Sequence, residues 1–389
     1  MKHDWEYKKL GEVGTIITGS TPPTSNPKNY ESKDICFVKP SDIEKEGITH
    51  ISKAENYISN YAYNNSCRRL PKGSVLITCI GIIGKVGILE VDATCNQQIN
   101  ALVPKEELSS KYIAYALLSI KELMQSVANA PVVPIINKGQ FSSFCIPLPP
   151  LSIQEQIVSE LDKVSEIIEK KKQQMKELDN LAQSIFYDMF GDPVENEKGW
   201  EVKTFGEIGE LQRGSGLSKK DLVESGYPCI LYGQIHTHYG AYTKQHITSI
   251  PKELVKTAKI AHTGDLIMAI TSEDVEGSCK STAWMGDYDI AIGSDAAIYR
   301  HSQNGIYVSY YTRTKAFYHE KEKYARGFKV THISTKEIAT IPIMLPPIAL
   351  QQAFAEKIEV IEKQKELITA SIKEAQTLFD ARMEYWFGE

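Results

Sequence analysis

The stretch Leu148-Pro149-Pro150-Leu151-Ser152-Ile153-Gln154-Glu155 opens the segment that decides the fold. Its two prolines lack an N–H and hold φ fixed, so both a strand and a helix must stop there. Ser152, three residues before Glu155, has the spacing of a capping box. The sequence therefore predicts a long helix that starts just after the prolines and continues to about Gly191.

Apolar or small residues recur along this predicted helix in alternating steps of four and three. The series is Ile157, Leu161, Val164, Ile168, Met175, Leu178, Ala182, Ile185 and Met189, with Lys171 as its one interruption. The other positions are rich in Glu, Lys and Gln. A seam with this period is typical of a coiled-coil helix.

The same arrangement returns in the segment that begins Leu345-Pro346-Pro347-Ile348. The second seam is Phe354, Ile358, Ile361, Ile368, Ile372, Ala375, Phe379 and Trp386, with Lys365 and Arg382 as polar interruptions. A single helix of this kind would most simply be a packing or dimerisation helix. Two copies in one chain are expected to pair with each other, and to run antiparallel.

The repeat extends into the segments that precede the two helices. At an offset of 195, Trp5-Glu6 recurs as Trp200-Glu201, Leu10–Val13 as Phe205–Ile208, and Gly19-Ser20 as Gly214-Ser215. Leu70–Ile77 corresponds to Ile260–Ile267, and Lys111–Tyr115 to Ile306–Tyr310. Short apolar runs after Gly turns predict strands at 75–80 and 266–270, and apolar spacing near 3.6 predicts helices at 109–126 and 305–321.

These patterns predict an α+β fold in which two similar globular domains are separated by two long helices. The helices form an antiparallel coiled coil, and the whole is a pseudo-twofold internal repeat. The expected segments are 1–150, 151–191, 192–345 and 346–389. A helix of ~35 residues spans roughly 50 Å, and twofold proteins read DNA half-sites ~34 Å apart. The helical rod would then act as a ruler.

Composition narrows the class of protein. A chain of 389 residues with 42% hydrophobic and 24% charged side chains fits two or three ordinary domains. Its first residues are polar and no apolar run approaches transmembrane length, so we expect no membrane association. The seven cysteines are scattered without a C-x-x-C pair. This pattern favours reduced thiols in the cytoplasm over a disulfide framework or a cysteine zinc site.

The net charge of −5 does not by itself indicate nucleic-acid binding. Its distribution is uneven, because residues 1–150 carry 16 basic and 14 acidic side chains whereas each long helix carries 5 and 8. The acidity therefore lies largely on the helices, and the globular segments remain candidates for a DNA-binding face.

Motifs for chemistry are mostly missing. Gly84-Lys85 lacks the Ser or Thr of a phosphate-binding loop, and Cys79 occupies the first glycine position of that motif. No dinucleotide-binding, amino-methyltransferase or nuclease motif and no nucleophile–base pair stands out. His236, His238 and His246 invite a metal site, but no acidic or cysteine partner is placed for one, so we favour surface-loop histidines. The sequence thus favours a binding or scaffold role.

The ordered, repeated set of motifs resembles the DNA-specificity (S) subunits of type I restriction–modification systems, over essentially the whole chain. The resemblance rests on Thr18-Gly19-Ser20-Thr21-Pro22, Arg213-Gly214-Ser215, Leu70–Leu76, Asn96-Gln97-Gln98 and the two Leu-Pro-Pro helix starts. Two departures stand out. The second domain has Gly293-Ser294-Asp295 where the first has Asn96-Gln97-Gln98, and Ala349 replaces the capping serine. We therefore expect the two half-sites to differ.

The resemblance implies a non-catalytic subunit of a methyltransferase–endonuclease complex. Each globular domain would be a target recognition domain that reads one half of a bipartite, asymmetric site in double-stranded DNA. The helices would set the gap and dock two methyltransferase (M) subunits, and restriction (R) subunits would join them. S-adenosylmethionine, ATP and Mg²⁺ are expected on those partners, and no cofactor or metal on this chain.

Candidate DNA-contacting residues follow from the chemistry of phosphates and base edges. In the first domain they are Ser20, Thr21, Lys39, Arg68, Arg69, Lys85, Asn96, Gln97 and Gln98. In the second they are Arg213, Ser215, Lys219, Lys220, Gln234, His236, Arg326, Lys329 and His332. The loop that holds Arg326 and Lys329 is the most basic in the second domain, which makes Arg326 the preferred candidate there.

Two alternatives stay open. One is that the chain is the specificity subunit of a related restriction system, which changes its partner but not its role. The other is that the chain is a structural adaptor whose two similar domains bind protein and not DNA. A DNA reader, together with its partner, would retard a duplex in a salt-sensitive way, and an adaptor would not.

Overall fold

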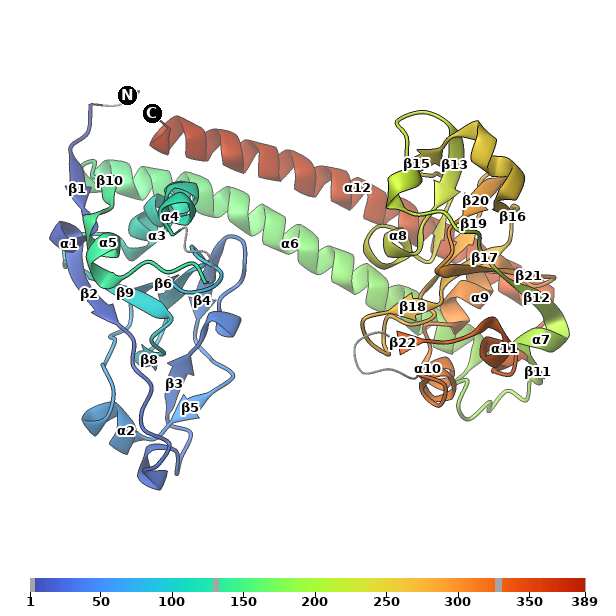
Figure 1. Cartoon of the computed structure of the whole chain (residues 1–389). Helices are drawn as coiled ribbons and strands as arrows, with labels where there is room; N and C mark the ends of the chain where they lie inside the picture. Colours follow the sequence, from blue (N-terminus) through green and yellow to red (C-terminus); the bar gives the residue numbers. More distant parts are fainter. Residues whose placement is uncertain (1–3, 129–132, 326–330, 389) are drawn as a thin grey trace. The chain divides into compact units, whose positions relative to one another are not determined.

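The computed structural model of the chain describes residues 4–128, 133–325 and 331–388. It divides into two compact units (Figure 1). Unit 1 combines Met1–Lys172 with Thr369–Glu389, and unit 2 is Gln173–Ile368. Each unit therefore holds one globular domain together with part of each long helix.

The globular domain of unit 1 is built on two sheets. The five-stranded sheet has the order β2 (Gly14–Thr18), β9 (Ile99–Pro104), β6 (Val75–Thr78), β7 (Val86–Leu89) and β4 (Ile48–Ile51). The three-stranded sheet has the order β5 (Tyr57–Ile58), β3 (Ile35–Val38) and β8 (Ala93–Cys95), and β1 (Tyr7–Lys9) pairs with β10 (Cys145–Pro147). The helices are α1 (Leu10–Val13), α2 (Asn60–Asn65), α3 (Ser110–Ser119), α4 (Lys121–Val127) and α5 (Lys138–Ser143), with 3-10 turns η1 (Pro27–Asn29) and η2 (Pro40–Asp42).

The globular domain of unit 2 repeats this plan. Its five-stranded sheet has the order β12 (Gly209–Arg213), β21 (Ala296–His301), β17 (Leu266–Ala269), β19 (Ser281–Trp284) and β14 (Tyr242–Thr243). A second sheet has the order β15 (Thr248–Ile250), β13 (Tyr227–Ile230), β20 (Ile290–Ile292) and β16 (Lys259–Ala261). The pairs β11 (Glu201–Thr204) with β23 (Pro342–Leu345) and β18 (Thr271–Ser272) with β22 (Thr331–His332) complete the strands. The helices are α7 (Phe205–Ile208), α8 (Tyr232–Thr237), α9 (Gly305–Tyr311), α10 (Lys315–Glu322) and α11 (Thr335–Ile338), with η3 (Lys219–Asp221) and η4 (Lys252–Thr257).

Strand pairing confirms the internal repeat and the α+β class. In unit 1, β2, β9, β6 and β7 pair antiparallel, and β4 adds to the edge in parallel. In unit 2, β12, β21, β17 and β19 do the same, and β14 is the parallel edge strand. The helices predicted at 109–126 and 305–321 exist, but each is divided into two shorter helices, α3 and α4 in unit 1 and α9 and α10 in unit 2. In unit 2 the break lies at Thr314, whose side chain caps α10 by accepting a hydrogen bond from Phe317 N.

A buried tyrosine ties each domain to the start of its long helix. In unit 1 the Tyr112 hydroxyl donates to Pro147 O at 2.7 Å, and in unit 2 the Tyr307 hydroxyl donates to Met344 O at 2.9 Å. Both rings are fully buried, and burial raises the pKa of both phenols. Because a buried hydroxyl needs a partner, these bonds fix the strand that leads into each Leu-Pro-Pro corner.

The long helices α6 (Leu151–Phe190) and α12 (Ile348–Phe387) span 40 residues each. Helix α6 begins at Leu151, so Ser152 lies inside its first turn and is not the cap that the sequence predicted. A glutamine anchors each first turn instead. Gln154 Nε2 donates to Pro149 O at 2.9 Å, and Gln351 Nε2 donates to Pro346 O at 2.8 Å.

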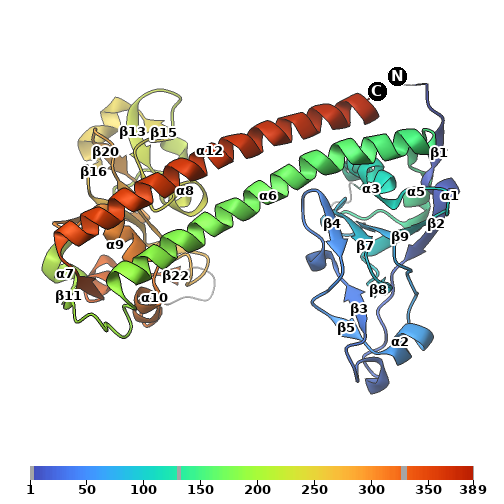
Figure 2. The ribbon, with the colours of Figure 1, turned by 180° about the vertical axis from the view of Figure 1, so that it is seen from behind.

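The predicted seams are the buried faces of these helices, which confirms the coiled coil (Figures 1 and 2). In unit 1 the beginning of α6, with Ile157 and Leu161, shares a core with Trp386 at the end of α12. In unit 2 the end of α6, with Phe186 and Phe190, shares a core with Phe354 at the beginning of α12. The helices are therefore antiparallel within each unit. None of the described helices combines the length and apolar composition needed to cross a lipid bilayer.

Candidate nucleic-acid interface

In unit 1, five candidate residues meet where the end of β2 lies against the loop after β8. The backbone of residues 18–21 joins residues 95–99 through Gly19 N to Ile99 O (3.0 Å) and Ser20 N to Cys95 O (2.9 Å). The Thr21 hydroxyl donates to Gln97 Oε1 at 2.7 Å. Asn96 Nδ2 donates to Gln98 Oε1 at 2.8 Å. Ser20, Thr21, Asn96, Gln97 and Gln98 therefore lie together, with Thr21 and Gln97 exposed, Ser20 and Gln98 half-buried and Asn96 buried.

Close backbone approach explains the glycine in this motif. A Cβ atom at Gly19 would lie 2.1 Å from Asn96 O and 2.4 Å from Cys95 O. At the equivalent Gly214, it would lie 2.1 Å from Gly293 O. All three distances are far below van der Waals contact, so only glycine lets the two loops meet in each unit.

Two arginines extend this surface. Arg68 Nη1 donates to Thr18 O at 2.7 Å, and its backbone N–H donates to the Ser20 hydroxyl at 3.2 Å. Both Arg68 and Arg69 are exposed. The loop pair of unit 1 therefore combines two exposed guanidinium groups with the polar side chains of Thr21 and Gln97.

The remaining two candidates of unit 1 are engaged elsewhere in the domain. Lys85 Nζ donates to Pro40 O at 2.7 Å and to Ile43 O at 2.6 Å. Lys39 Nζ donates to Asn56 Oδ1 at 3.0 Å. The Lys85 ammonium thus stabilises the turn around η2, a role that its sequence neighbourhood did not indicate.

Unit 2 brings the equivalent loops together with different side chains. Ser215 N donates to Ile292 O at 3.0 Å. Arg213 Nε donates to Ser294 O at 2.8 Å, and its Nη2 lies 3.4 Å from Asp295 Oδ1. The loop pair therefore recurs, but an ion pair of Arg213 with Asp295 joins its two segments in unit 2, whereas a hydrogen bond of Thr21 with Gln97 joins them in unit 1.

Lys219 and Lys220 follow this loop pair in η3, and both are exposed. Ser218 and Asp221 hold that turn through a hydrogen bond from Ser218 N to Asp221 Oδ2 at 2.7 Å. Gln234, by contrast, is used inside the domain, because its Nε2 donates to the Thr248 hydroxyl at 2.9 Å and its Oε1 accepts from Leu231 N.

Two candidate histidines meet at Thr271. His236 Nε2 lies 3.1 Å from Thr271 O, and His332 Nδ1 lies 3.2 Å from Thr271 Oγ1. The pairing of β18 with β22 brings residues 271 and 332 side by side. Arg326 and Lys329 lie outside the described residues.

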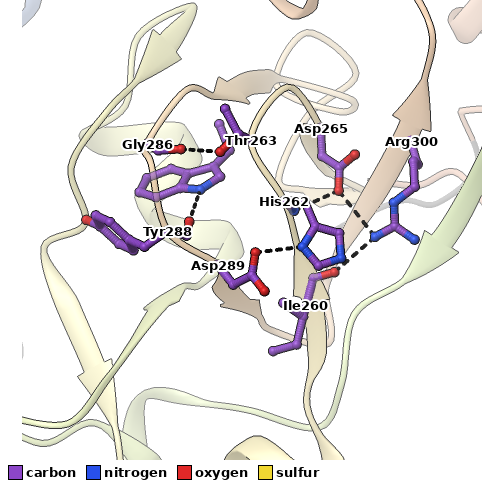
Figure 3. A network of polar contacts seen from close by, with 9 residues as sticks. Ile260, His262, Thr263, Asp265, Gly286, Tyr288, Asp289 and Arg300 are labelled. Atoms are coloured by element: carbon purple, nitrogen blue, oxygen red, sulfur yellow. Dashed lines mark hydrogen bonds and ion pairs between the residues drawn. The ribbon is translucent and has the colours of Figure 1, made fainter.

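A polar network that the sequence did not predict connects the ends of β16, β17, β20 and β21 in unit 2 (Figure 3). His262 Nδ1 lies 2.6 Å from Asp289 Oδ1. Asp265, only 5% exposed, accepts hydrogen bonds from His262 N at 2.9 Å and Arg300 Nη2 at 3.3 Å. The internal repeat gave one indication that Asp265 has a structural role, because Asp265 follows Gly264 as Ser74 follows Gly73. Nothing in the sequence pointed to Asp289.

The histidines of unit 2 do not form one group. His246 Nδ1 bonds to the Tyr288 hydroxyl at 2.6 Å, whereas His236 faces Thr271. Across residues 4–128, 133–325 and 331–388, no set of three or more His, Cys, Asp or Glu side chains has the geometry of a metal site. The described loop pairs are hydrogen-bonding surfaces with exposed cations, which is the chemistry that contacts phosphates and base edges.

Similar proteins point to one family. The pattern of the family described as "Type I restriction modification DNA specificity domain" matches residues 2–180 and again 197–377. The MjaIX specificity subunit of a type I restriction enzyme from Methanocaldococcus jannaschii is 30% identical over 56% of this chain and 55% of its own length. The EcoR124I/EcoR124II specificity subunit from Escherichia coli is 32% identical over 41% of this chain and 40% of its own length. These alignments span about half the length of the curated relatives.

Longer matches agree with them. The putative MjaX specificity subunit from Methanocaldococcus jannaschii is 26% identical over 97% of this chain and 91% of its own length. The crystal structure of a type I restriction–modification S subunit from M. genitalium superposes with a TM-score of 0.53 at 14% identity, covering 99% of this chain and 96% of the other. That structure shares the fold. With both of its globular domains and most of both long helices inside the matched segments, the chain belongs to the type I restriction modification DNA specificity family.

Proposed function

We propose that this chain is the DNA-specificity subunit of a type I restriction–modification complex. The observation that carries the proposal is the duplicated loop pair: residues 18–21 with 95–98 in unit 1, and 213–216 with 292–295 in unit 2. Each pair adjoins exposed cations, Arg68 and Arg69 in one unit and Lys219 and Lys220 in the other. Two like surfaces in one internally repeated chain suit the two half-sites of a duplex DNA target.

The segments take separate roles in this proposal. Residues 1–150 and 192–345 act as target recognition domains, and 151–191 and 346–389 act as spacer helices that set the gap between half-sites. Arginine and lysine side chains hold phosphates, while Thr21, Gln97, Ser215 and their neighbours face base edges. Because Asn96-Gln97-Gln98 is replaced by Gly293-Ser294-Asp295, the two halves of the site differ in sequence.

A second DNA-facing surface in unit 2 comprises His236, Thr271 and His332. Its support is the convergence of two histidines and a threonine hydroxyl from separate elements, α8, β18 and β22. We also retain Arg326 and Lys329, which precede β22 in the sequence, as phosphate contacts.

The helices dock two methyltransferase subunits, with which restriction subunits assemble. A row of exposed apolar residues on α12 supports protein docking. Val360 and Leu367 in the unit 2 part of α12 are seven residues apart, as are Leu378 and Tyr385 in its unit 1 part, so each two share a helix face, and Leu367 is 72% exposed. S-adenosylmethionine, ATP and Mg²⁺ are bound by those partners, and this chain carries no catalytic centre. The complex works in the cytoplasm.

The test is salt-dependent DNA binding by the chain together with its methyltransferase subunit. Duplex fragments that contain the recognised site should be retained at moderate salt, with an affinity that falls steeply as salt rises. A structural adaptor predicts no DNA retention beyond that of the methyltransferase alone. That result would reject the proposal.

A further inference from the structure

The hairpin that joins β6 to β7, residues 79–85, lies at the same end of the five-stranded sheet as the loop pair of unit 1. Antiparallel register places the end of β2 beside the start of β9, the start of β9 beside the end of β6, and the end of β6 beside the start of β7. Cys79 N donates to Gln98 O at 2.8 Å, and Asn100 Nδ2 donates to Cys79 Sγ at 3.2 Å. The hairpin therefore continues the candidate nucleic-acid interface.

The tip of this hairpin presents an aliphatic side chain to solvent. Ile82 is 57% exposed, whereas the next residue, Ile83, is buried in the core of the domain. Gly81 and Gly84 flank the two isoleucines with φ of +78° and +88°, a conformation that favours glycine. A Cβ at Gly84 would also lie 2.7 Å from the side chain of Lys121. The sequence Gly-Ile-Ile-Gly thus turns one isoleucine inward and the other outward.

Hydrogen bonds hold the tip in this conformation. Within the hairpin, Gly84 N donates to Thr78 O at 3.0 Å, and the Thr78 hydroxyl donates to Ile82 O at 2.5 Å. From a neighbouring segment, Pro134 O accepts from Gly81 N at 3.1 Å. Because the backbone around Ile82 is already ordered, contact with a ligand there costs little further conformational entropy.

The surroundings of the tip suit the edge of a base pair. Exposed Ile135 forms a strand bridge with the hairpin, Lys138 is exposed three residues later, and Arg68 is exposed beside the loop pair. Glu44 and Glu46 precede β4, at the opposite edge of the sheet from β2, so the side that binds phosphate is the β2 side. The major groove of DNA admits a two-stranded β-ribbon. An apolar tip beside cations and hydrogen-bonding side chains can meet a base edge while those cations hold phosphates.

The equivalent hairpin of unit 2 ends in side chains of opposite character. It joins β17 to β19, and the structure describes its whole tip, residues 271–277. Glu273, Asp274 and Glu276 are exposed there, and the aliphatic Val275 is half-buried. The internal repeat therefore has an apolar tip in unit 1 and an acidic tip in unit 2.

We propose that Ile82 reads a thymine in the half-site of unit 1 by packing against the C5 methyl group in the major groove. Thymine alone among the four bases presents a methyl group there, and apolar side chains contact it. This inference rests on the proposed function and deepens it, because it assigns one base to one half-site.

The test uses the chain assembled with its methyltransferase subunit and duplexes of the recognised site in which each thymine in turn is replaced by deoxyuridine, which lacks only the C5 methyl group. At one position the unaltered chain should lose affinity about fourfold, the effect of one buried methyl group. Ile82→Ala should bind the thymine duplex at least about fourfold more weakly and should no longer distinguish uracil at that position. Because no charge is removed, the slope of log K against log salt should not change.

Two further variants serve as controls. Ile82→Leu keeps a branched aliphatic side chain and should still distinguish thymine from uracil. Val91, which is 37% exposed, follows β7 at the opposite end of the sheet from the hairpin. Val91→Ala should therefore bind both duplexes as the unaltered chain does.

Three results overturn the inference: no position at which uracil weakens binding, a preference for thymine that persists unchanged in Ile82→Ala, or weaker assembly of Ile82→Ala with the methyltransferase subunit. The last of these would assign Ile82 to protein docking. If the unaltered assembly binds no DNA, the proposed function itself fails, and that outcome is distinct from the other three.

Discussion

Arg382 of α12 forms an ion pair with Glu160 of α6, with 2.9 Å between Nη2 and Oε2. The same carboxylate accepts a hydrogen bond from Trp386 Nε1 at 3.0 Å. In unit 2, Lys365 of α12 pairs with Asp179 of α6 at 2.8 Å. Both polar interruptions of the second seam therefore meet a carboxylate of the facing helix. Such pairs specify register and orientation in a coiled coil.

We expect a measurable coupling between Glu160 and Arg382. Partial burial acts to raise the pKa of Glu160, but hydrogen bonds from Trp386 and Gln156 and the Arg382 charge hold it below its usual value. Both side chains are partly exposed, so solvent screens the pair, and a double-mutant cycle with Glu160→Ala and Arg382→Ala should give about 0.5–1 kcal/mol. Urea unfolding at low and high salt measures it. Zero coupling at low salt would show that the pair does not contribute to the register.

Substitution by alanine should destabilise the chain at Gly214 but leave its stability almost unchanged at Gly216. A Cβ at Gly214 would lie 2.1 Å from Gly293 O, whereas a Cβ at Gly216 has no atom within 4 Å. Gly214→Ala should cost at least about 2 kcal/mol, while Gly216→Ala should stay within about 0.5 kcal/mol. The thermal midpoints of the two variants provide the comparison. Equal midpoints would mean that the two loops do not approach as described.

His301 makes unit 2 sensitive to acid. Burial lowers the pKa of His301 to about 4, despite the opposing effect of the Asp265 charge. In the unfolded chain the pKa of this histidine is about 6.5, so below that pH the unfolded state binds a proton that the folded state does not. The contribution of neutral His301 to the free energy of unfolding is therefore fully present above about pH 6.5 and is lost as the pH falls toward 4. The loss of folding free energy from this one group is at most about 3.5 kcal/mol.

The matched variant for that prediction is His301→Gln, which does not titrate. Between pH 7 and 5 the urea midpoint of the unaltered chain should fall more than that of the variant. Parallel pH profiles for the two chains would indicate that His301 is protonated as easily in the folded chain as in the unfolded one.

Lys219 and Lys220 should contribute phosphate contacts. In the assembled complex, Lys219→Ala with Lys220→Ala should weaken DNA binding and lower the slope of log K against log salt by about two. The control is Lys203→Ala with Lys336→Ala, which removes the same charge from β11 and α11, away from the loop pair. An equal change of slope in both variants would rule out a specific role for η3.

Periodicity and repetition were enough to predict the α+β class, the duplication and both helical seams. Each of these depends on local spacing that the sequence displays directly. The predicted seam did not include Phe186 and Phe190, which are buried. These rings lie on a second face of α6, outside the heptad positions, and pack against the globular domain of unit 2.

Fewer features of the candidate nucleic-acid interface could be predicted from the sequence. The repeated glycine–serine motif pointed to the loop pair, but the contact of Thr21 with Gln97 joins residues 76 positions apart. The hydrogen bonds from Lys85 to two carbonyl oxygens and the pairing of His262 with Asp289 likewise depend on tertiary structure. Residue type alone does not separate a lysine that holds a turn from one that meets a phosphate.

The central claim, that the chain reads a split DNA site, is tested most directly by mapping methylated adenines across the genome. Cells would carry the methyltransferase subunit with and without this chain. The account predicts a methylated motif that requires the chain and consists of two short, unlike halves around a fixed gap. Methylation that is unchanged by removing the chain would contradict the account.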